Sequence, residues 1–133
     1  MNLCVWFNQI LKQNIIPVCC AITHDGDGQL FNTNADTITA EIGKSLSKNF
    51  EIKLNYCFEL PGVMKDIRDS SSLIKKINKK SYESLLLNNA ISKGMIPKLH
   101  NAFNALTGGV KEVAIGGAAM INRAVPYTSV TLR

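Results

Sequence analysis

The spacing of apolar residues along the chain predicts alternating helices and strands. Apolar side chains recur at positions 3, 6, 7, 10 and 11, which is the spacing of one face of an amphipathic helix. The next apolar run, residues 15–22 (IIPVCCAI), is continuous and β-branched, so it predicts a strand buried on both faces. Pro17 fits that strand poorly, because proline cannot donate a hydrogen bond to a neighbouring strand. Residues 24–29 (HDGDGQ) predict a tight turn, since Asp-Gly pairs adopt the left-handed backbone of such turns.

The rest of the chain continues this alternation. A second helix begins near Asn34, a residue that can cap it, and runs to about residue 47. Further along, the pattern predicts strands over residues 51–58, 110–115 and 127–132, and helices over residues 71–77, 80–88 and 94–106. No repeat or long linker divides the chain, so we expect one α/β domain with a largely parallel central sheet and helices on both faces. Ligands of such sheets bind at the carboxyl ends of strands, here residues 24–34, 59–66 and 116–117.

Composition narrows the class of protein. The chain has 133 residues, 46% of them hydrophobic and 19% charged, which excludes intrinsic disorder. Its longest strongly apolar run is far shorter than the roughly 18 residues that a membrane-spanning helix needs. The first residues lack the basic start of a secretory signal, so we expect a cytoplasmic protein. The four cysteines have apolar neighbours and no C-x-x-C spacing, which predicts buried thiols at Cys4, Cys19, Cys20 and Cys57.

The clearest candidate for chemistry is residues 92–98 (SKGMIPK), where glycine and then proline mark a helix start between Lys93 and Lys98. A helix N-terminus already carries partial positive charge and unpaired N–H groups, so two lysines there place like charges together. A bound anion, most simply phosphate, would resolve that conflict. The alternative is that both lysines extend into solvent.

A second candidate is residues 32–36 (NTNAD) at the predicted start of the second helix. Asn34 as a cap and Asp36 as a first-turn acid are explained by the needs of the helix alone. The functional alternative is that Asn32 and Asn34 offer amides to a polar ligand. In that case Asp36 orients lysines near a transferring phosphoryl group.

Several other functions are excluded or disfavoured. The DGDG run is not a calcium loop, because position six of that loop requires glycine and Leu30 stands there. The chain contains neither a P-loop nor a dinucleotide fingerprint, and no serine or cysteine stands in a nucleophile motif. Residues 65–80 carry six cations against two acids, but interleaved aromatics are missing and residues 75–80 (KKINKK) indicate a solvated connection. We therefore expect neither nucleic acid nor a membrane as a partner.

Four blocks of sequence, in order, resemble one family. They are residues 16–36, which end in NTNAD, residues 59–63 (ELPGV), residues 90–98 (AISKGMIPK) and residues 108–113 (GGVKEV). Together they are similar to the C-terminal half of the acetylglutamate kinases, a branch of the amino acid kinase family. The chain departs from the family's pattern at Glu59, where aspartate is usual, and at Phe58 and Lys93.

This resemblance implies transfer of the ATP γ-phosphoryl group to the side-chain carboxylate of N-acetyl-L-glutamate, a step of arginine biosynthesis. It implies Lys98 and Asp36 as catalytic residues, Asn32 and Asn34 as substrate-binding residues, and Mg²⁺ accompanying the nucleotide. The implied ATP-binding residues are Glu59, Leu60, Pro61, Gly62, Val63, Met64, Ala90, Ile91 and Ser92.

Members of that family are about twice as long as this chain. The resemblance therefore implies that residues 1–133 form a single unit, the nucleotide-binding C-terminal half of a kinase domain. The substrate-binding N-terminal half, with its glycine-rich phosphate loops, is not here. We therefore expect a chain that needs this missing half as a partner, is weakly active alone, and exposes the surface that the half would cover. A homo-oligomer is also compatible with the resemblance. Two alternatives stay open: a family member with another acceptor, such as a different N-acyl-glutamate, glutamate or aspartate, and a non-catalytic nucleotide-binding remnant.

Overall fold

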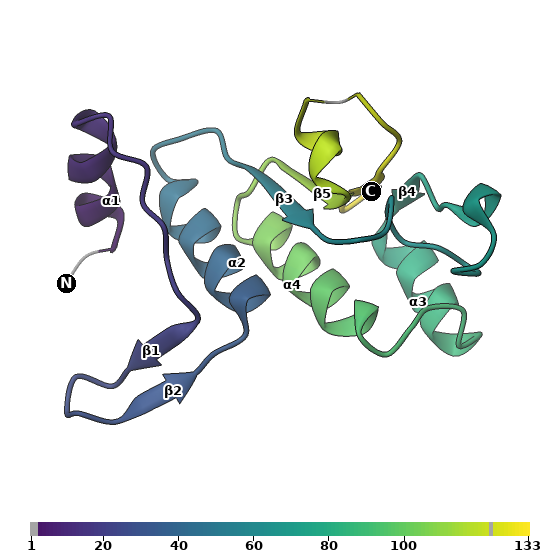
Figure 1. Ribbon diagram of the computed structural model, residues 1–133, viewed down its shortest axis with the longest axis horizontal. Coiled ribbons are helices and arrows are strands. Elements are labelled where there is room, and N and C mark those ends of the chain that lie inside the picture. Colours follow the sequence, from purple (N-terminus) through teal and green to yellow (C-terminus); the bar gives the residue numbers. More distant parts are fainter. Residues whose placement is uncertain (1–2, 123) are drawn as a thin grey trace.

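The computed structural model describes residues 3–122 and 124–133. The α/β fold expected from the sequence is confirmed (Figure 1). The elements in chain order are α1 (Leu3–Lys12), β1 (Ile22–His24), β2 (Leu30–Asn32), α2 (Ala35–Leu46), β3 (Lys53–Cys57), the 3₁₀ helix η1 (Ser70–Ser72), β4 (Lys76–Ile77), α3 (Lys79–Leu87), α4 (Met95–Thr107), β5 (Glu112–Gly116), the 3₁₀ helix η2 (Ala118–Asn122) and β6 (Thr128–Val130).

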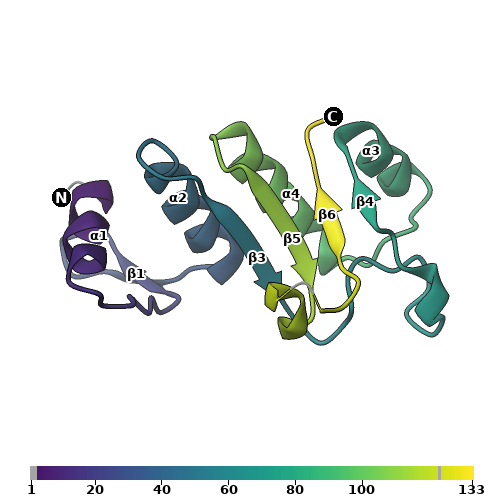
Figure 2. The same cartoon turned by 90° about the horizontal axis from the view of Figure 1, so that it is seen from above.

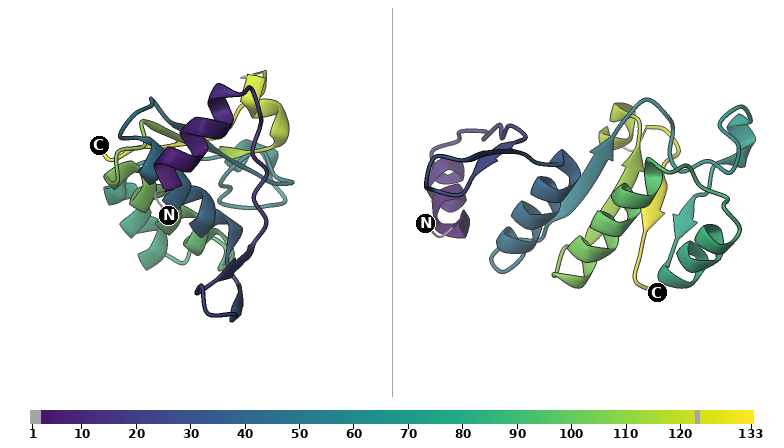
Figure 3. Two further views of the ribbon diagram at one scale, coloured as in Figure 1. Left: turned by 90° about the vertical axis from the view of Figure 1, so that its left-hand side faces the viewer. Right: turned by 90° about the horizontal axis from the view of Figure 1, so that it is seen from below.

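A four-stranded sheet of order β3-β5-β6-β4 forms the centre of the molecule. The pairs β3–β5 and β4–β6 are parallel and the pair β5–β6 is antiparallel, so the sheet is mostly parallel. Helices α2, α4 and α3 lie side by side over one face of this sheet, while η2 lies on the other side (Figures 2 and 3). Strand β3 alternates accordingly, with Leu54 and Tyr56 buried toward the helices and Lys53, Asn55 and Cys57 exposed.

The core lies between this sheet and α2, α3 and α4. Leu99 of α4 and Val113 and Ile115 of β5 are fully buried in it. Small residues, Ala40 on α2 and Ala105 on α4, are also fully buried, and small side chains let two helices approach closely. A separate, smaller cluster of Cys4, Phe7 and Leu46 holds α1 against α2.

The predicted strand over residues 15–22 is wrong. Only Ile22 belongs to a strand, β1, and β1 pairs antiparallel with β2 in a hairpin outside the central sheet (Figure 1). The predicted turn inside that hairpin is confirmed, because Gly26 and Gly28 both have positive φ and the Asp25 carboxylate accepts hydrogen bonds from the turn. The apolar run of residues 15–22, which the sequence predicts to be buried, is largely exposed. No strand of the central sheet among the described residues pairs with it.

The predicted helix over residues 71–77 is also wrong. In its place η1 is followed by β4, which pairs with β6. The Asp69 side chain accepts hydrogen bonds from both the N–H and the hydroxyl of Ser71, so the serine-rich stretch forms a short capped turn. Ile77 is fully buried in the core, and burial of this residue in a strand prevails over helix propensity.

The expected burial of the cysteines holds for Cys4 alone. Cys19, Cys20 and Cys57 are exposed. Cys19 and Cys20 are exposed because residues 15–22 lie outside the sheet, and Cys57 because it lies on the open face of β3. No helix within the described residues is long and apolar enough to cross a membrane.

Candidate functional site

An ion pair between α2 and α4 joins two residues that the sequence singled out. The Lys98 ammonium donates hydrogen bonds to both carboxylate oxygens of Asp36, over 2.8 Å to Oδ1 and 2.7 Å to Oδ2. The two side chains are only 16% and 23% exposed. A pair that is this well shielded from water interacts more strongly than a surface salt bridge. The predicted Asp36–Lys98 association is therefore present as a direct contact.

Local capping chemistry places Asp36 in this pair. The Asn34 side chain caps α2 by accepting hydrogen bonds from the N–H groups of Asp36 and Thr37, at 2.8 and 3.3 Å. Asp36 therefore lies in the first turn of α2, where the helix dipole favours a negative charge. Thr37 and Asn101 form a partly buried hydrogen-bonded contact between α2 and α4, which holds the two helices side by side.

Tyr56 of β3, which the sequence analysis did not identify, contacts both members of the ion pair. Its hydroxyl donates to the backbone carbonyl of Asp36 at 3.1 Å, and the Lys98 ammonium lies 5.1 Å from the centre of its ring. That distance is within cation–π range. Burial, together with the charge of Asp36, raises the pKa of Tyr56 well above its ordinary value, so the phenol stays protonated. The alternation of β3 was the only sequence signal for this residue.

A cavity of about 480 Å³ lies between the loop that follows β3 and the segment that joins α3 to α4. Most of the predicted ATP-binding residues line it: Leu60, Gly62, Val63, Met64, Ala90, Ile91 and Ser92. Its other lining residues, which the sequence analysis did not assign to a site, are Lys65, Asp66, Ile67, Arg68, Asn89 and Met95. The structure thus brings two distant sequence blocks to one cavity.

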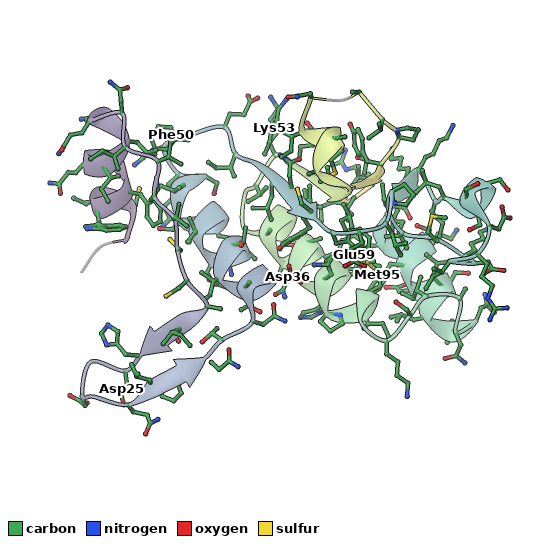
Figure 4. The ribbon with its side chains drawn as sticks, in the orientation of Figure 1. Asp25, Asp36, Phe50, Lys53, Glu59 and Met95 are labelled. Atoms are coloured by element: carbon green, nitrogen blue, oxygen red, sulfur yellow. The ribbon has the colours of Figure 1, made fainter. Side chains whose placement is uncertain are left out.

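Two predicted ATP-binding residues, Glu59 and Pro61, are exposed and do not line this cavity. They belong to the same loop as the lining residues Leu60 and Gly62, but they are not part of the cavity wall. Asn32 ends β2 and is exposed, and Asn34 is occupied as the cap of α2. Figure 4 labels Asp36 at the start of α2 and Met95 at the start of α4, with Asp25 out on the hairpin.

The loop that lines the cavity is fixed by a buried hydroxyl. Thr128 of β6 is fully buried; its hydroxyl accepts from the Val63 N–H at 2.8 Å and donates to the Ile74 carbonyl at 2.7 Å. Gly62 packs directly against it, and a Cβ there would lie 2.5 Å from the Thr128 hydroxyl. Gly116 at the end of β5 is similarly required, because a Cβ would lie 2.6 Å from the carbonyl oxygen of Pro61. The position of this loop thus depends on contacts that leave no space for a side chain.

Positive charge gathers around the cavity. Lys65 and Arg68 lie on its wall, and their signal in the sequence is the excess of cations over residues 65–80. Met95 opens α4, whose N-cap residue Gly94 provides no side-chain hydrogen bond. The first N–H groups of α4 therefore have no side-chain cap at an end of the helix that favours anions.

The cavity and the ion pair are linked through α4. Met95 lines the cavity, and Lys98 follows three residues later, so both lie on one face of the helix, one turn apart. Apolar side chains from Val63, Ile91 and Met95, together with two cations on the wall, suit a ligand with a flat apolar group and an anionic tail.

Comparison with known proteins identifies the family of the chain. Residues 7–117 match the family model described as "Amino acid kinase family". The chain belongs to the amino acid kinase family. Within that family it is a homologue of proteins named acetylglutamate kinase: 49% identical over 106 residues to the one from Cytophaga hutchinsonii, and 43% identical over 115 residues to the one from Bacteroides fragilis. These matches cover 80% and 86% of this chain but only 40% and 44% of the relatives' own lengths.

Two solved structures share the fold of this chain. A Streptococcus mutans protein matches 97% of this chain with a TM-score of 0.79 at 22% identity. The N-acetylglutamate synthase from Neisseria gonorrhoeae matches 98% of the chain with the same TM-score at 21% identity. The chain covers 48% and 31% of those proteins, so its fold corresponds to one part of each.

Proposed function

We propose that residues 1–133 form the ATP-binding C-terminal half of an acetylglutamate kinase. In this function the γ-phosphoryl group of ATP is transferred to the side-chain carboxylate of N-acetyl-L-glutamate, in the cytoplasm, as a step of arginine biosynthesis. The observation that supports the proposal is the Asp36–Lys98 ion pair, whose Lys98 lies one helical turn after Met95 of a cavity that seven of the nine predicted nucleotide-binding residues line.

In the proposed reaction, an oxygen of the substrate carboxylate bonds to the γ-phosphorus while the bond from phosphorus to the β–γ bridging oxygen breaks. ADP leaves with that electron pair, and an acyl phosphate forms. Such a transfer is catalysed mainly by positioning and by stabilising the charge on the phosphoryl oxygens. Lys98 supplies positive charge to those oxygens, and Asp36 holds its ammonium in place against Tyr56.

Magnesium fits this site only as a partner of the nucleotide. Among the described residues no group of three His, Cys, Asp or Glu side chains gathers to hold a metal. Asp66 is the one carboxylate among the residues that line the cavity. Mg²⁺ is usually held by one or two carboxylates together with substrate phosphates, which agrees with this arrangement. When bound, the ion would neutralise charge on the β- and γ-phosphates.

The acceptor side of the reaction is less complete in this chain. Asn32 and the amide nitrogen of Asn34 are available to a polar substrate beside Asp36. The remaining contacts to the acceptor would come from the other half of the fold, because the chain spans less than half the length of its curated relatives. We therefore expect the isolated chain to bind nucleotide weakly and to turn over slowly or not at all.

Calorimetric titration with Mg-ADP tests the nucleotide site. The double variant Lys65→Ala/Arg68→Ala removes two cations from the cavity wall, and Lys79→Ala/Lys80→Ala removes two exposed cations of α3 that do not line it. Both variants change the net charge equally, so only a local effect distinguishes them. We expect the first to weaken binding by about tenfold, or ~1.4 kcal/mol, and the second to leave it nearly unchanged.

Equal weakening by both variants would contradict a phosphate site at the cavity. Absence of any Mg-ADP binding by a chain shown to be folded would contradict the proposal as well. Family membership would then reflect ancestry, as in a non-catalytic remnant. Adding the missing half and comparing N-acetyl-L-glutamate with free glutamate, aspartate and other N-acyl-glutamates then tests the acceptor.

A further inference from the structure

One wall of the cavity is a loop, residues 65–72, that is folded onto itself. An antiparallel bridge between Met64 and Leu73 closes its base. Inside the loop, the Ser72 hydroxyl donates to the Asp66 carbonyl at 2.7 Å and accepts from the Asp66 N–H at 3.1 Å. The loop contains η1 and projects from the molecule at the β4 end of the sheet (Figure 2). It is therefore a bonded unit that stands out from the core.

This loop is joined to the rest of the molecule at its base. Among the described residues, the hydrogen bonds of residues 65–72 all run to other members of the loop, and none of its charged side chains forms an ion pair. At the base, the Ile74 N–H donates to the Val63 carbonyl at 2.8 Å. The loop can therefore approach a ligand in the cavity without losing any of these bonds.

The loop carries one apolar side chain, Ile67, and that side chain lines the cavity. The other residues of the sequence 65–72 (KDIRDSSS) are all polar, and Ile67 is 61% exposed. A single exposed isoleucine is ordinary on a protein surface. This one, however, shares the cavity with Met95, which is buried in the main core. A flat apolar group bound there would remove surface of Ile67 from water, which is favourable.

Charge on the same loop fits the same kind of ligand. Lys65 and Arg68, on either side of Ile67 in the sequence, also line the cavity. One loop thus presents an apolar side chain together with two cations. A nucleotide has the matching parts, a flat base and anionic phosphates.

We propose that Ile67 is a nucleotide-binding residue that packs against the base, and that the 65–72 loop covers the bound nucleotide. This inference rests on the proposed function, because the ligand is the nucleotide of the proposed kinase reaction. It adds a contact from a loop that the sequence analysis did not assign to the site. The Ile67 side chain has no hydrogen-bonding group, so it contributes affinity by burial of apolar surface.

Calorimetric titration with Mg-ADP tests the contact. Ile67→Ser removes the apolar side chain from the cavity, and Ile121→Ser makes the same change at a residue of η2 that is 58% exposed and does not line the cavity. We expect Ile67→Ser to weaken Mg-ADP binding by about fivefold and Ile121→Ser to leave it nearly unchanged. Ile67→Leu keeps the apolar surface, so it should bind within about twofold of the wild type.

Trypsin cleavage tests whether the loop covers the nucleotide. Arg68 is an exposed cleavage site on the loop, and Lys48, in the exposed turn after α2, is a control site away from the cavity. Saturating Mg-ADP should slow cleavage after Arg68 by about fivefold or more, because a loop held on a ligand opens less often. Cleavage after Lys48 should keep its rate.

The outcomes separate this inference from the proposed function. Unchanged Mg-ADP binding in Ile67→Ser, or equal weakening in Ile121→Ser, overturns the Ile67 contact. Weakening in Ile67→Leu as strong as in Ile67→Ser also overturns it, because the apolar surface is then not what binds. Cleavage after Arg68 that is as fast with saturating Mg-ADP as without it overturns the covering role. In each of these cases Mg-ADP still binds, so the proposed function stands. A folded wild-type chain that binds no Mg-ADP contradicts the proposed function itself, and the inference with it.

Discussion

At the scale of single residues, the site depends on a shielded ion pair whose two members lie 62 residues apart in the chain. A partly buried carboxylate that loses its partner is costly, whereas removing both charges together is often tolerated. Asp36 and Lys98 are therefore coupled energetically as well as functionally.

We predict that Lys98→Met lowers the free energy of unfolding by about 1–3 kcal/mol, because Asp36 then keeps an unpaired charge beside the core. The double variant Asp36→Asn/Lys98→Met should recover about 1 kcal/mol or more of that loss. Urea unfolding of the wild type, both single variants and the double variant measures this coupling. Strictly additive effects would show that the contact contributes nothing to stability.

Lys98→Met should also weaken Mg-ATP more than Mg-ADP in the same calorimetric titration. The proposed role of Lys98 is to contact the γ-phosphoryl group, which ADP lacks. Equal weakening of both nucleotides would instead place the ammonium against the β-phosphate.

At the scale of elements, the loop after β3 is shaped by the strand β6 behind it. The Thr128 hydroxyl both accepts from Val63 and donates to Ile74, so one buried group joins the cavity wall to the sheet. Removal of a buried hydroxyl leaves both of its partners without a hydrogen bond.

We predict that Thr128→Val, which nearly preserves shape, lowers the free energy of unfolding by about 1–3 kcal/mol and weakens Mg-ADP binding. Thr131→Val, whose hydroxyl donates to the terminal Arg133 carbonyl in an exposed position, is the matched control. Thermal unfolding and calorimetry measure the two effects. If Thr128→Val leaves both quantities at wild-type values, the hydroxyl is not what positions the loop.

At the scale of the whole molecule, two hydrophobic clusters of unequal size stabilise the fold. The main core joins the sheet to α2, α3 and α4, whereas α1 is held by the small cluster of Cys4, Phe7 and Leu46. The chain's single tryptophan, Trp6, packs edge-on against Phe7 with 5.1 Å between the ring centres. Trp6 also lines a groove together with Ile38 and Ile42 of α2, so its emission reports on the docking of α1.

We predict that Phe7→Ala undocks α1 while the main core stays folded. Hydrogen exchange of α1 should accelerate by about tenfold or more, whereas that of β5 should change little, because local openings follow local contacts. The Trp6 emission should shift toward longer wavelength as its surroundings become wetter. Gln9→Ala, an exposed position on the same helix, is the control. Simultaneous acceleration in β5 would show that the two clusters unfold as one unit.

Sequence alone determined the features that arise from local chemistry. Apolar periodicity predicts the helices α1, α2 and α4, and side-chain capping predicts the role of Asn34. The Asp-Gly turn follows from glycines that adopt positive φ. All of these effects act within a few residues. The candidate residues Asp36 and Lys98 follow in the same way, as an acid at one helix start and a lysine at another, and the family resemblance predicts a nucleotide-binding role for residues 59–64.

Only the tertiary structure decided how these parts combine. It brought Asp36 into contact with Lys98 and placed Tyr56 against both. It assembled the cavity from residues 60–68 and 89–95. It also made a strand of residues 76–77, which have a helical pattern in the sequence. It also left residues 16–20 unpaired, although their sequence is that of a buried strand. The physical reason is that burial and strand pairing need a partner surface, and whether this partner is present cannot be read from the strand itself.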